Sequence, residues 1–579
     1  MVEFKYPFEL DDVEQAHGGD PFACTLYKML PKPMQESTRE DVHLLEYLHM
    51  VPVNDVGIPE YFPVLSSKLK DKKKLNLIYP VEGNIYIHIM DDPEGGRAFY
   101  IFIEPRLSSG LDEKNLIREV EVLLMDYPME FEGVQTPEDQ KEVLLRLLDV
   151  LTHEQPTDES GVRAFLNKLI RNKSEKGLQI SDRDKKVLKY IIIRDKIGMG
   201  VLDPMIHDDN IEDISCSGLG PIFIEHKIFD GLRTAFIFTE EAELDTFVLR
   251  LSERIKKPVT FRTPVIDAVL PDGSRINIVY GTDVSKRGSN FTIRKFSEIP
   301  LSLLELISFG SLDFNMAAYL SIAIESGMNI FVSGETASGK TTLMNAITVF
   351  IKPNAKIISI EDTPEVQVPH PNWIREVTRA EKPGQPGTGV GMFDLLKAAL
   401  RQRPDEIIIG EIRGEEGLIA FQAMQTGHSC MATFHASTVQ KLIQRLTGSP
   451  ISVPKTYVDN LNIVVIQSSV RLPNGKVGRR AVSISEIISY DSAADSFSFA
   501  EVFQWNPVTD EFDFVGENNS YLLEYKIAPM RGIPPTKKRQ IYALVKRRAR
   551  ILEKLSQSGV NDYFEFYKVI SKAQKEGIF

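Results

Sequence analysis

Apolar residues in the second half of the chain recur as short runs, separated by longer amphipathic stretches. Each run has the length of a buried strand, and the stretches between them are long enough for helices. Strands that alternate with helices predict a parallel sheet covered on both faces. The predicted strands are 329–332, 356–360, 406–409, 431–434 and 461–466; further strands are predicted within 477–488 and 500–515, and closing helices at 537–555 and 562–575.

The first half of the chain mixes short strands with helices. The predicted strands are 75–79, 85–90 and 98–104, and the predicted helices are 115–127, 137–151, 162–172 and 182–197. From residue 211 short strands return, followed by a helix at 241–255 and a hairpin around the turn at 271–273. We therefore expect an N-terminal α+β docking region (1–110), a helical connector (111–179), a smaller α+β middle domain (180–297), a hinge at 296–301 and an α/β domain with C-terminal helices (298–579).

Composition narrows the class of protein. The 579 residues are 42% hydrophobic and 26% charged, as in a soluble globular protein, and the net charge of −13 argues against stable nucleic-acid binding without excluding a local basic channel. Three scattered cysteines, Cys24, Cys216 and Cys430, favour neither a disulfide framework nor a cysteine zinc site, and they suit a reducing cytoplasm. We expect no signal peptide at the acidic start, and no run reaches the ~18 apolar residues of a transmembrane helix.

A glycine-rich loop follows the first predicted strand of the α/β domain. Residues 334–341 match G-x-x-x-x-G-K-[ST] between that strand and a helical run at 343–351. The backbone N–H groups of such a loop point at phosphate oxygens, lysine pairs with phosphates and the hydroxyl binds Mg²⁺. We therefore expect ATP and Mg²⁺ here, with cofactor-binding residues Gly334, Glu335, Thr336, Ala337, Ser338, Gly339, Lys340, Thr341 and Thr342.

Carboxylates follow two other predicted strands. Glu361 and Asp362 end the strand at 356–360, where a carboxylate can polarise an attacking water; the alternative is a turn or helix-cap acid. Glu411 follows the run at 407–409 in a Walker B arrangement, although Gly410 stands where an aspartate is common. Glu411 would then face Mg²⁺, and Arg413 would pair with Glu411 or with phosphates. The alternative is a buried strand that ends in an exposed acid.

Two histidines, His428 and His435, flank the predicted strand at 431–434. Zinc would need more ligands at close spacing than the sequence offers here. Taken alone, such histidines are more often packed or surface residues than functional ones.

These four stretches together resemble the Walker A, Asp box, Walker B and His box of the type II/type IV secretion ATPases. The phosphate loop, IEDTPE, LRQRPDEIIIGEIRG and QTGHSCMATFHA occur in the family's order. IEDISCSG, VPHPNWIREVTR and RLTGSPISVPKTY look like the archaeal branch, the archaellum and archaeal pilus motors. The likeness covers about residues 180 to 490, and three cysteines cannot build the tetracysteine zinc module that bacterial members often carry.

The resemblance implies a RecA-like P-loop NTPase domain and a role for each matching residue. Glu361 looks like the general base, Glu411 the Walker B acid, and His428 and His435 look like sensors of nucleotide state. Arg275, Arg287 and Arg294 lie in the stretch where the family's preceding domain supplies phosphate-reaching arginines; the alternative is that each is a surface or structural arginine.

The resemblance also implies what the protein does. We expect a cytoplasmic homo-hexameric ATPase, peripherally associated with the inner face of the cell membrane. It would act on a polytopic membrane platform protein and power the assembly or rotation of a type IV-pilus-like filament, or secretion through such a machine. A conjugation-type secretion ATPase is an alternative. Two rival classes remain open: a nucleic-acid-translocating motor, which nucleic-acid-stimulated turnover would favour, and a nucleotide-gated scaffold with little turnover.

Overall fold

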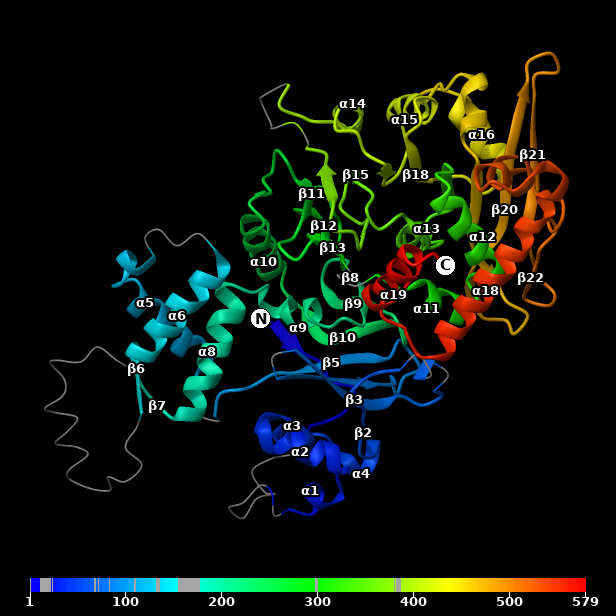
Figure 1. Cartoon of the computed structure of the whole chain (residues 1–579). Coiled ribbons are helices and arrows are strands. Elements are labelled where there is room, and N and C mark those ends of the chain that lie inside the picture. The colour runs from blue at the N-terminus through cyan, green and yellow to red at the C-terminus, as the bar shows by residue number, and fades with distance from the viewer. Residues whose placement is uncertain are drawn as a thin grey trace, which may run out of the picture. The chain divides into compact units, whose positions relative to one another are not determined.

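The chain forms two compact units, Met1–Phe296 and Ser297–Phe579 (Figure 1). The predicted hinge at 296–301 coincides with this division. The computed structural model describes residues 2–10, 22, 24–66, 69–70, 72–82, 84–108, 111–131, 136–154, 178–296, 300–379, 381 and 387–579. The helix predicted at 162–172 and residues 297–299 of the hinge lie outside these ranges.

The first unit is built on one large sheet. Its strand order is β11-β12-β13-β8-β9-β10-β5-β4-β3-β2, with β1 paired to β10. The strands are β1 (Val2–Phe4), β2 (Glu60–Tyr61), β3 (Asn76–Val81), β4 (Ile85–Met90), β5 (Phe99–Ile103), β8 (Ile211–Cys216), β9 (Gly220–His226), β10 (Asp230–Phe238), β11 (Val265–Val269), β12 (Arg275–Val279) and β13 (Asn290–Arg294). A separate pair joins β6 (Thr152–Glu154) to β7 (Leu178–Ile180).

Four helices of the first unit begin and end close to the predicted positions: α5 (Glu113–Leu124), α6 (Pro137–Leu151), α8 (Asp182–Lys196) and α10 (Glu241–Arg254). The unit also contains α1 (Thr25–Met29), α2 (Lys32–Glu40), α3 (Val42–Met50), α4 (Val53–Val56) and α9 (Asp203–Ile206). Local caps explain several starts: Thr136 accepts a hydrogen bond from the backbone N–H of Asp139, and Ser181 accepts one from Asp184.

One feature of the first unit differs from the expected division. The predicted N-terminal region and the predicted middle domain contribute strands to the same sheet, because β10 pairs in parallel with β5. This pairing joins Arg233 to Phe99, far apart in the chain, and leaves no local signal. Residues 1–296 are therefore one compact unit, and how its segments divide in function stays a prediction.

The second unit confirms the predicted α/β architecture. Its sheet has the order β16-β15-β17-β18-β14-β19-β20-β21-β22, parallel from β16 to β19 and antiparallel beyond. The strands are β14 (Ile330–Gly334), β15 (Ile357–Glu361), β16 (Trp373–Val377), β17 (Glu406–Ile409), β18 (Ser429–Phe434), β19 (Ile463–Arg471), β20 (Val477–Asp491), β21 (Ser496–Asn506) and β22 (Glu511–Asp513).

Helices cover both faces of this sheet. Successive side chains of a buried strand point to opposite faces, so apolar residues on both faces need a covering layer. In β14, Ile330 and Val332 join one apolar cluster, whereas Phe331 joins the other. The first cluster includes residues of α11 (Leu303–Ser308), α12 (Phe314–Glu325), α13 (Lys340–Ile347), α18 (Ile541–Gln557) and α19 (Tyr563–Lys575). The second includes residues of α14 (Met392–Ala399), α15 (Glu416–Gln425) and α16 (Val439–Thr447), and the short α17 (Ala528–Met530) precedes α18.

Candidate active site

Four parallel strands end at one edge of the second sheet. The register pairs Ser333 of β14 with Phe434 of β18, Ala432 of β18 with Ile409 of β17, and Ile409 with Ile360 of β15. The residues that follow these positions therefore lie along the same carboxyl-end edge. This edge brings together the glycine-rich loop, Glu361, Glu411 and His435, in the place where open α/β sheets bind ligands.

The loop after β14 has the backbone that the motif predicts. Gly339 has a φ of +89°, and a β-carbon at Gly334 would lie 2.0 Å from the carbonyl oxygen of Gln467, so both positions require glycine. The helix α13 begins at Lys340 with no side-chain cap. The Lys340 ammonium lies over the loop, where it donates a 2.8 Å hydrogen bond to the carbonyl oxygen of Glu335.

These features fit a polyphosphate. An uncapped helix start presents backbone N–H groups and the positive end of the helix dipole to an anion. Lys340 adds a full positive charge to this end of α13, and no acidic residue stands in the helix's first turn. The half-buried Thr341 hydroxyl and the Glu411 carboxylate offer oxygen atoms, the ligand type that Mg²⁺ prefers.

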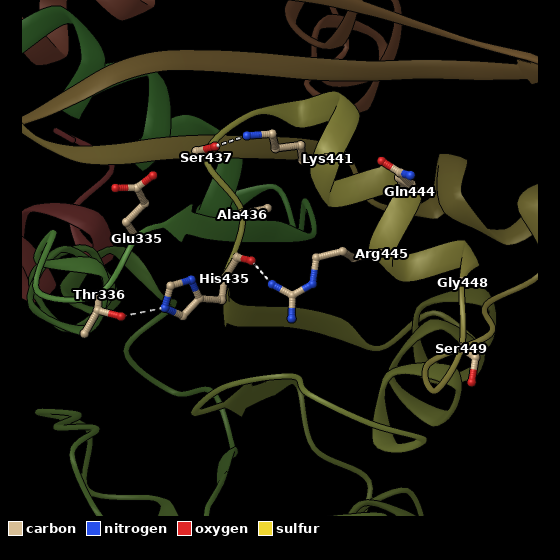
Figure 2. Close-up of a pocket in the computed structure, with 10 residues that line it drawn as sticks. All are labelled: Glu335, Thr336, His435, Ala436, Ser437, Lys441, Gln444, Arg445, Gly448 and Ser449. Atoms are coloured by element: carbon tan, nitrogen blue, oxygen red, sulfur yellow. Dashed lines mark hydrogen bonds between the residues drawn. The ribbon is translucent and has the colours of Figure 1, made fainter.

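A cavity of about 870 Å³ adjoins the loop on its β18 side (Figure 2). His435 lies between the loop and α16: its Nε2 is 2.8 Å from the Thr336 hydroxyl, and its carbonyl oxygen accepts a hydrogen bond from Arg445. Lys441 and Arg445 make this wall basic. His435 thus connects the phosphate loop directly to the end of β18.

Glu361 is almost completely buried, with 1% of its surface exposed. One carboxylate oxygen accepts hydrogen bonds from the backbone N–H groups of Glu365 (2.8 Å) and Val366 (2.6 Å), and the other lies 3.5 Å from Nε of Arg375. Burial raises the pKa of Glu361 above its ordinary value, although these N–H groups and the Arg375 charge oppose the rise. A carboxylate with a raised pKa suits proton abstraction near neutral pH.

Gly410 has a packing reason to depart from aspartate. A β-carbon at this position would lie 3.1 Å from Cγ of Glu361, so the glycine leaves room for the glutamate to lean across the end of β17. Glu411, the next residue, is half-buried and accepts a 2.6 Å hydrogen bond from Nη2 of Arg413. Of the two partners expected for Arg413, the structure shows the pairing with Glu411, and its action on phosphates stays a prediction.

Comparison with known proteins places this site in a family. Residues 210–494 match the model of the type II/IV secretion system protein family. The chain is also 44% identical over 545 residues to the uncharacterized protein MJ0900 of Methanocaldococcus jannaschii, covering 94% of this chain and 97% of that one. The chain belongs to the type II/IV secretion system protein family. Its match to MJ0900 supports the archaeal branch.

More distant members share parts of the chain. The type IV secretion system protein VirB11 of Bartonella quintana is 33% identical over 226 residues, which cover 33% of this chain and 63% of VirB11. Among solved structures, the pilus retraction motor PilT with bound ADP is 18% identical, covers 49% of this chain and 80% of PilT, and has a TM-score of 0.35. The fold described above rests on the strand order and not on this likeness.

One of the family's two histidines lies away from the site. His428 precedes β18 and His435 follows it, so β18 separates them by about 20 Å. His428 sits at the amino-end edge, where its Nδ1 lies 3.1 Å from the Thr426 hydroxyl. Within one chain, only His435 of the two lies beside the phosphate loop, and the sensing of nucleotide by either histidine stays a prediction.

The three predicted arginines all belong to the first unit. Arg275 and Arg294 are cross-strand partners on β12 and β13, both exposed, and Arg275 forms a 2.7 Å ion pair with Asp267. Arg287 lies apart from them in the loop between these strands, where its carbonyl oxygen packs against Gly218. The structure therefore brings Arg275 and Arg294 together and leaves Arg287 separate. The action of all three on phosphates stays a prediction.

Two further arginines beside the site escaped the sequence analysis. Nε of Arg479, on β20, donates a 3.2 Å hydrogen bond to the carbonyl oxygen of Ala337 in the phosphate loop. Arg375, on β16, forms the ion pair with Glu361. The only sequence signal for Arg479 is a pair of arginines after the turn at 473–475.

Within the described ranges, every helix is too short or too polar to span a bilayer.

Proposed function

We propose that this protein is an ATP hydrolase that powers a type IV-pilus-like filament machine: an archaellum, an archaeal pilus or a type II secretion system. One observation carries the proposal. The phosphate loop, a buried carboxylate with a raised pKa, a second acid and a histidine converge on one sheet edge. Family membership supports the same conclusion.

Each residue of this edge has a distinct task in the proposed reaction. The amino end of α13 and Lys340 bind the phosphates, and Thr341 and Glu411 hold Mg²⁺, which neutralises phosphate charge when bound. Glu361 accepts a proton from the attacking water. Through its hydrogen bond to Thr336, His435 transmits the state of the loop to α16. Arg275, Arg287 and Arg294 supply positive charge to the phosphates from the first unit.

The proposed motor works as a homo-hexamer on a polytopic membrane platform protein, at the inner face of the cell membrane. ATP favours one arrangement of the two units, and hydrolysis releases it. Moving such an equilibrium from 1:99 to 99:1 takes about 5.5 kcal/mol of differential binding. Contacts to phosphate that form in only one arrangement are charge-assisted hydrogen bonds, and a few of them supply a differential binding free energy of this size.

Steady-state hydrolysis of ATP by the purified full-length chain tests the enzyme. We expect Mg²⁺-dependent turnover that added single- or double-stranded DNA does not change by more than about twofold. Stimulation by DNA would instead favour the nucleic-acid motor. Tight ATP binding without turnover would favour the nucleotide-gated scaffold.

A second experiment tests the machine that the enzyme serves. Tagged protein is cross-linked in native membranes and its partners are identified. We expect a polytopic membrane protein together with filament subunits, whose type would name the machine. Recovery of DNA-handling proteins without a membrane partner would contradict this part of the proposal.

A further inference from the structure

The last helix of the chain lies outside the segment that matches the family. The match ends at residue 494, whereas α19 spans Tyr563–Lys575. This helix, red in Figure 1, packs against the short turn η6 (Thr348–Phe350) that continues the phosphate-loop helix α13. A segment without a counterpart in the family model therefore contacts the support of the nucleotide site.

Tyr563 makes the central contact of α19. Its hydroxyl is buried, 2.8 Å from the hydroxyl of Thr348 and 3.2 Å from the carbonyl oxygen of Gln367. It also lies 3.3 Å from the carbonyl oxygen of Asn345. One phenol thus bridges the end of α13 and the segment that follows Glu361, since Gln367 belongs to that segment.

Asn345 on α13 holds the same segment from the other side. Its side-chain N–H₂ donates to the carbonyl oxygen of Glu365 (3.0 Å), and its side-chain oxygen accepts from the backbone N–H of Gln367 (3.1 Å). The N–H groups of Glu365 and Val366 in turn hold the Glu361 carboxylate. A continuous chain of hydrogen bonds therefore runs from Tyr563 to Glu361.

A second contact fixes the far end of this segment to α19. The ring of His370 lies 4.8 Å from the ring of Tyr567, and its Nε2 is 3.0 Å from the carbonyl oxygen of Ile351. His370 is buried. The stretch from Glu361 to His370 is thus held at two points by α19, one turn of helix apart.

We propose that α19 positions the carboxylate of Glu361, with Tyr563 as the positioning residue, so that the C-terminal helix sets the rate of hydrolysis without touching the nucleotide. This inference rests on the proposed role of Glu361 as the base. Loss of the phenol hydroxyl leaves the buried carbonyl of Gln367 with a weaker set of donors, and the segment shifts or loosens. The Glu361 carboxylate moves with it, because its N–H partners belong to that segment.

Tyr563→Phe tests the inference, with Tyr542→Phe as its matched control. Tyr542 is a buried tyrosine of α18 whose hydroxyl binds Ser520 and Glu524 and has no hydrogen bond to the Glu361 segment. We expect Tyr563→Phe to lower kcat by about tenfold, short of the roughly 100-fold that an ångström of misplacement can cost. ATP affinity should stay within about twofold of wild type, and Tyr542→Phe should leave kcat within about twofold. Thr348→Val, which removes the facing hydroxyl, should repeat the effect of Tyr563→Phe.

A double variant distinguishes positioning from a general loss of stability. In a Glu361→Gln background, Tyr563→Phe should cause no further fall in kcat, because the group that it positions is already gone. A full additional tenfold loss there, or equal losses in Tyr563→Phe and Tyr542→Phe, would overturn the inference.

Amide hydrogen exchange provides a readout that does not depend on turnover. Tyr563→Phe should speed exchange in the peptide spanning 361–370, and Tyr542→Phe should not. Faster exchange with near-normal turnover in Glu361→Gln would mean that the clamp is real and the proposed base is wrong. Unchanged exchange in Tyr563→Phe would refute the clamp itself, whatever Glu361 does.

Discussion

The two edges of the parallel sheet in the second unit use similar residues for different purposes. At the carboxyl-end edge, Lys340 begins α13, Glu361 ends β15 and His435 follows β18. At the amino-end edge, Asn329 ties neighbouring segments together through hydrogen bonds to Asn460, Asn462 and Cys430. Position along the strand decides the chemistry, because only the carboxyl-end edge faces the N–H groups of a helix start.

The amino-end edge supplies a natural control for each of these groups. Lys356 precedes β15 and donates to the carbonyl oxygen of Gln402, Glu406 begins β17, and His428 precedes β18. The lysines, the glutamates and the histidines thus form three pairs, and the two members of a pair have the same residue type but lie at opposite edges of one sheet. Comparing the two single substitutions of a pair therefore isolates the effect of the edge on ATP hydrolysis.

The lysine pair should differ most. Lys340→Ala removes the charge that we propose to meet the phosphates, and we expect ATP turnover to fall by at least about 1,000-fold. Lys356→Ala should keep turnover within about twofold. Hydrolysis is measured by phosphate release at saturating ATP. Residual turnover near wild type in Lys340→Ala would show that the phosphate loop is not where ATP is hydrolysed.

The glutamate pair should come next. Glu361→Gln should bind ATP normally and hydrolyse it about 100- to 1,000-fold more slowly, because a positioned general base contributes on this scale. Glu406 is also buried, and burial raises its pKa well above the ordinary value. Glu406→Gln should nevertheless retain turnover within about threefold. ATP affinity and kcat are measured separately for both variants, and equal losses of kcat would break the distinction between the edges.

The histidine pair should give a smaller contrast. His435→Ala removes the 2.8 Å contact with Thr336, and we expect a loss of about tenfold in kcat, the scale of one well-placed hydrogen bond. His428→Ala should lie within about twofold of wild type. Mixing His428→Ala chains with Lys340→Ala chains gives a further check: restored turnover in the mixture, and none in either variant alone, would place His428 at a neighbouring subunit's site and contradict the contrast within one chain.

The smallest effect concerns pH. Burial raises the pKa of Glu361 and the Arg375 charge lowers it, so removing that charge leaves burial less opposed and the pKa rises further. The proposed base must be deprotonated to accept a proton, so the acid limb of the kcat–pH profile in Arg375→Gln should move to higher pH. Turnover on the alkaline side should change by less than about threefold. A profile that moves to lower pH would mean that the limb reports another group.

Local patterns predicted the phosphate loop and most strands of the second unit, because both are written in adjacent residues, but they did not predict β16. The run at 406–409 became β17 with the same bounds, and Gly339 adopts the left-handed backbone that its motif requires. The pairing of β5 with β10 could not be predicted in this way, since nothing near Phe99 indicates a partner at Arg233. Tertiary pairing also explains why local patterns do not predict Arg479 and Arg375 at the site: each reaches it from a strand, β20 or β16, whose place in the sheet is not written in neighbouring residues.

The separation of His428 from the phosphate loop is different, because the sequence does predict it. His428 and His435 belong to one family motif, but the predicted strand at 431–434 lies between them. A strand places the residues before and after it at opposite edges of its sheet, so the sequence contained the information needed to separate them. For Glu361 and Glu411, the same reasoning puts both carboxylates at one edge, as the structure does.

Gly410 and Glu361 constrain each other's substitution. A β-carbon at 410 would lie 3.1 Å from the glutamate's Cγ, so an aspartate at 410 requires the side chain of Glu361 to shift by a few tenths of an ångström. With both acids in place, two carboxylates would lie close together, and their repulsion would disfavour the ionised form of Glu361. An aspartate at 410 should therefore be tolerated better beside a shorter side chain at 361 than beside the glutamate.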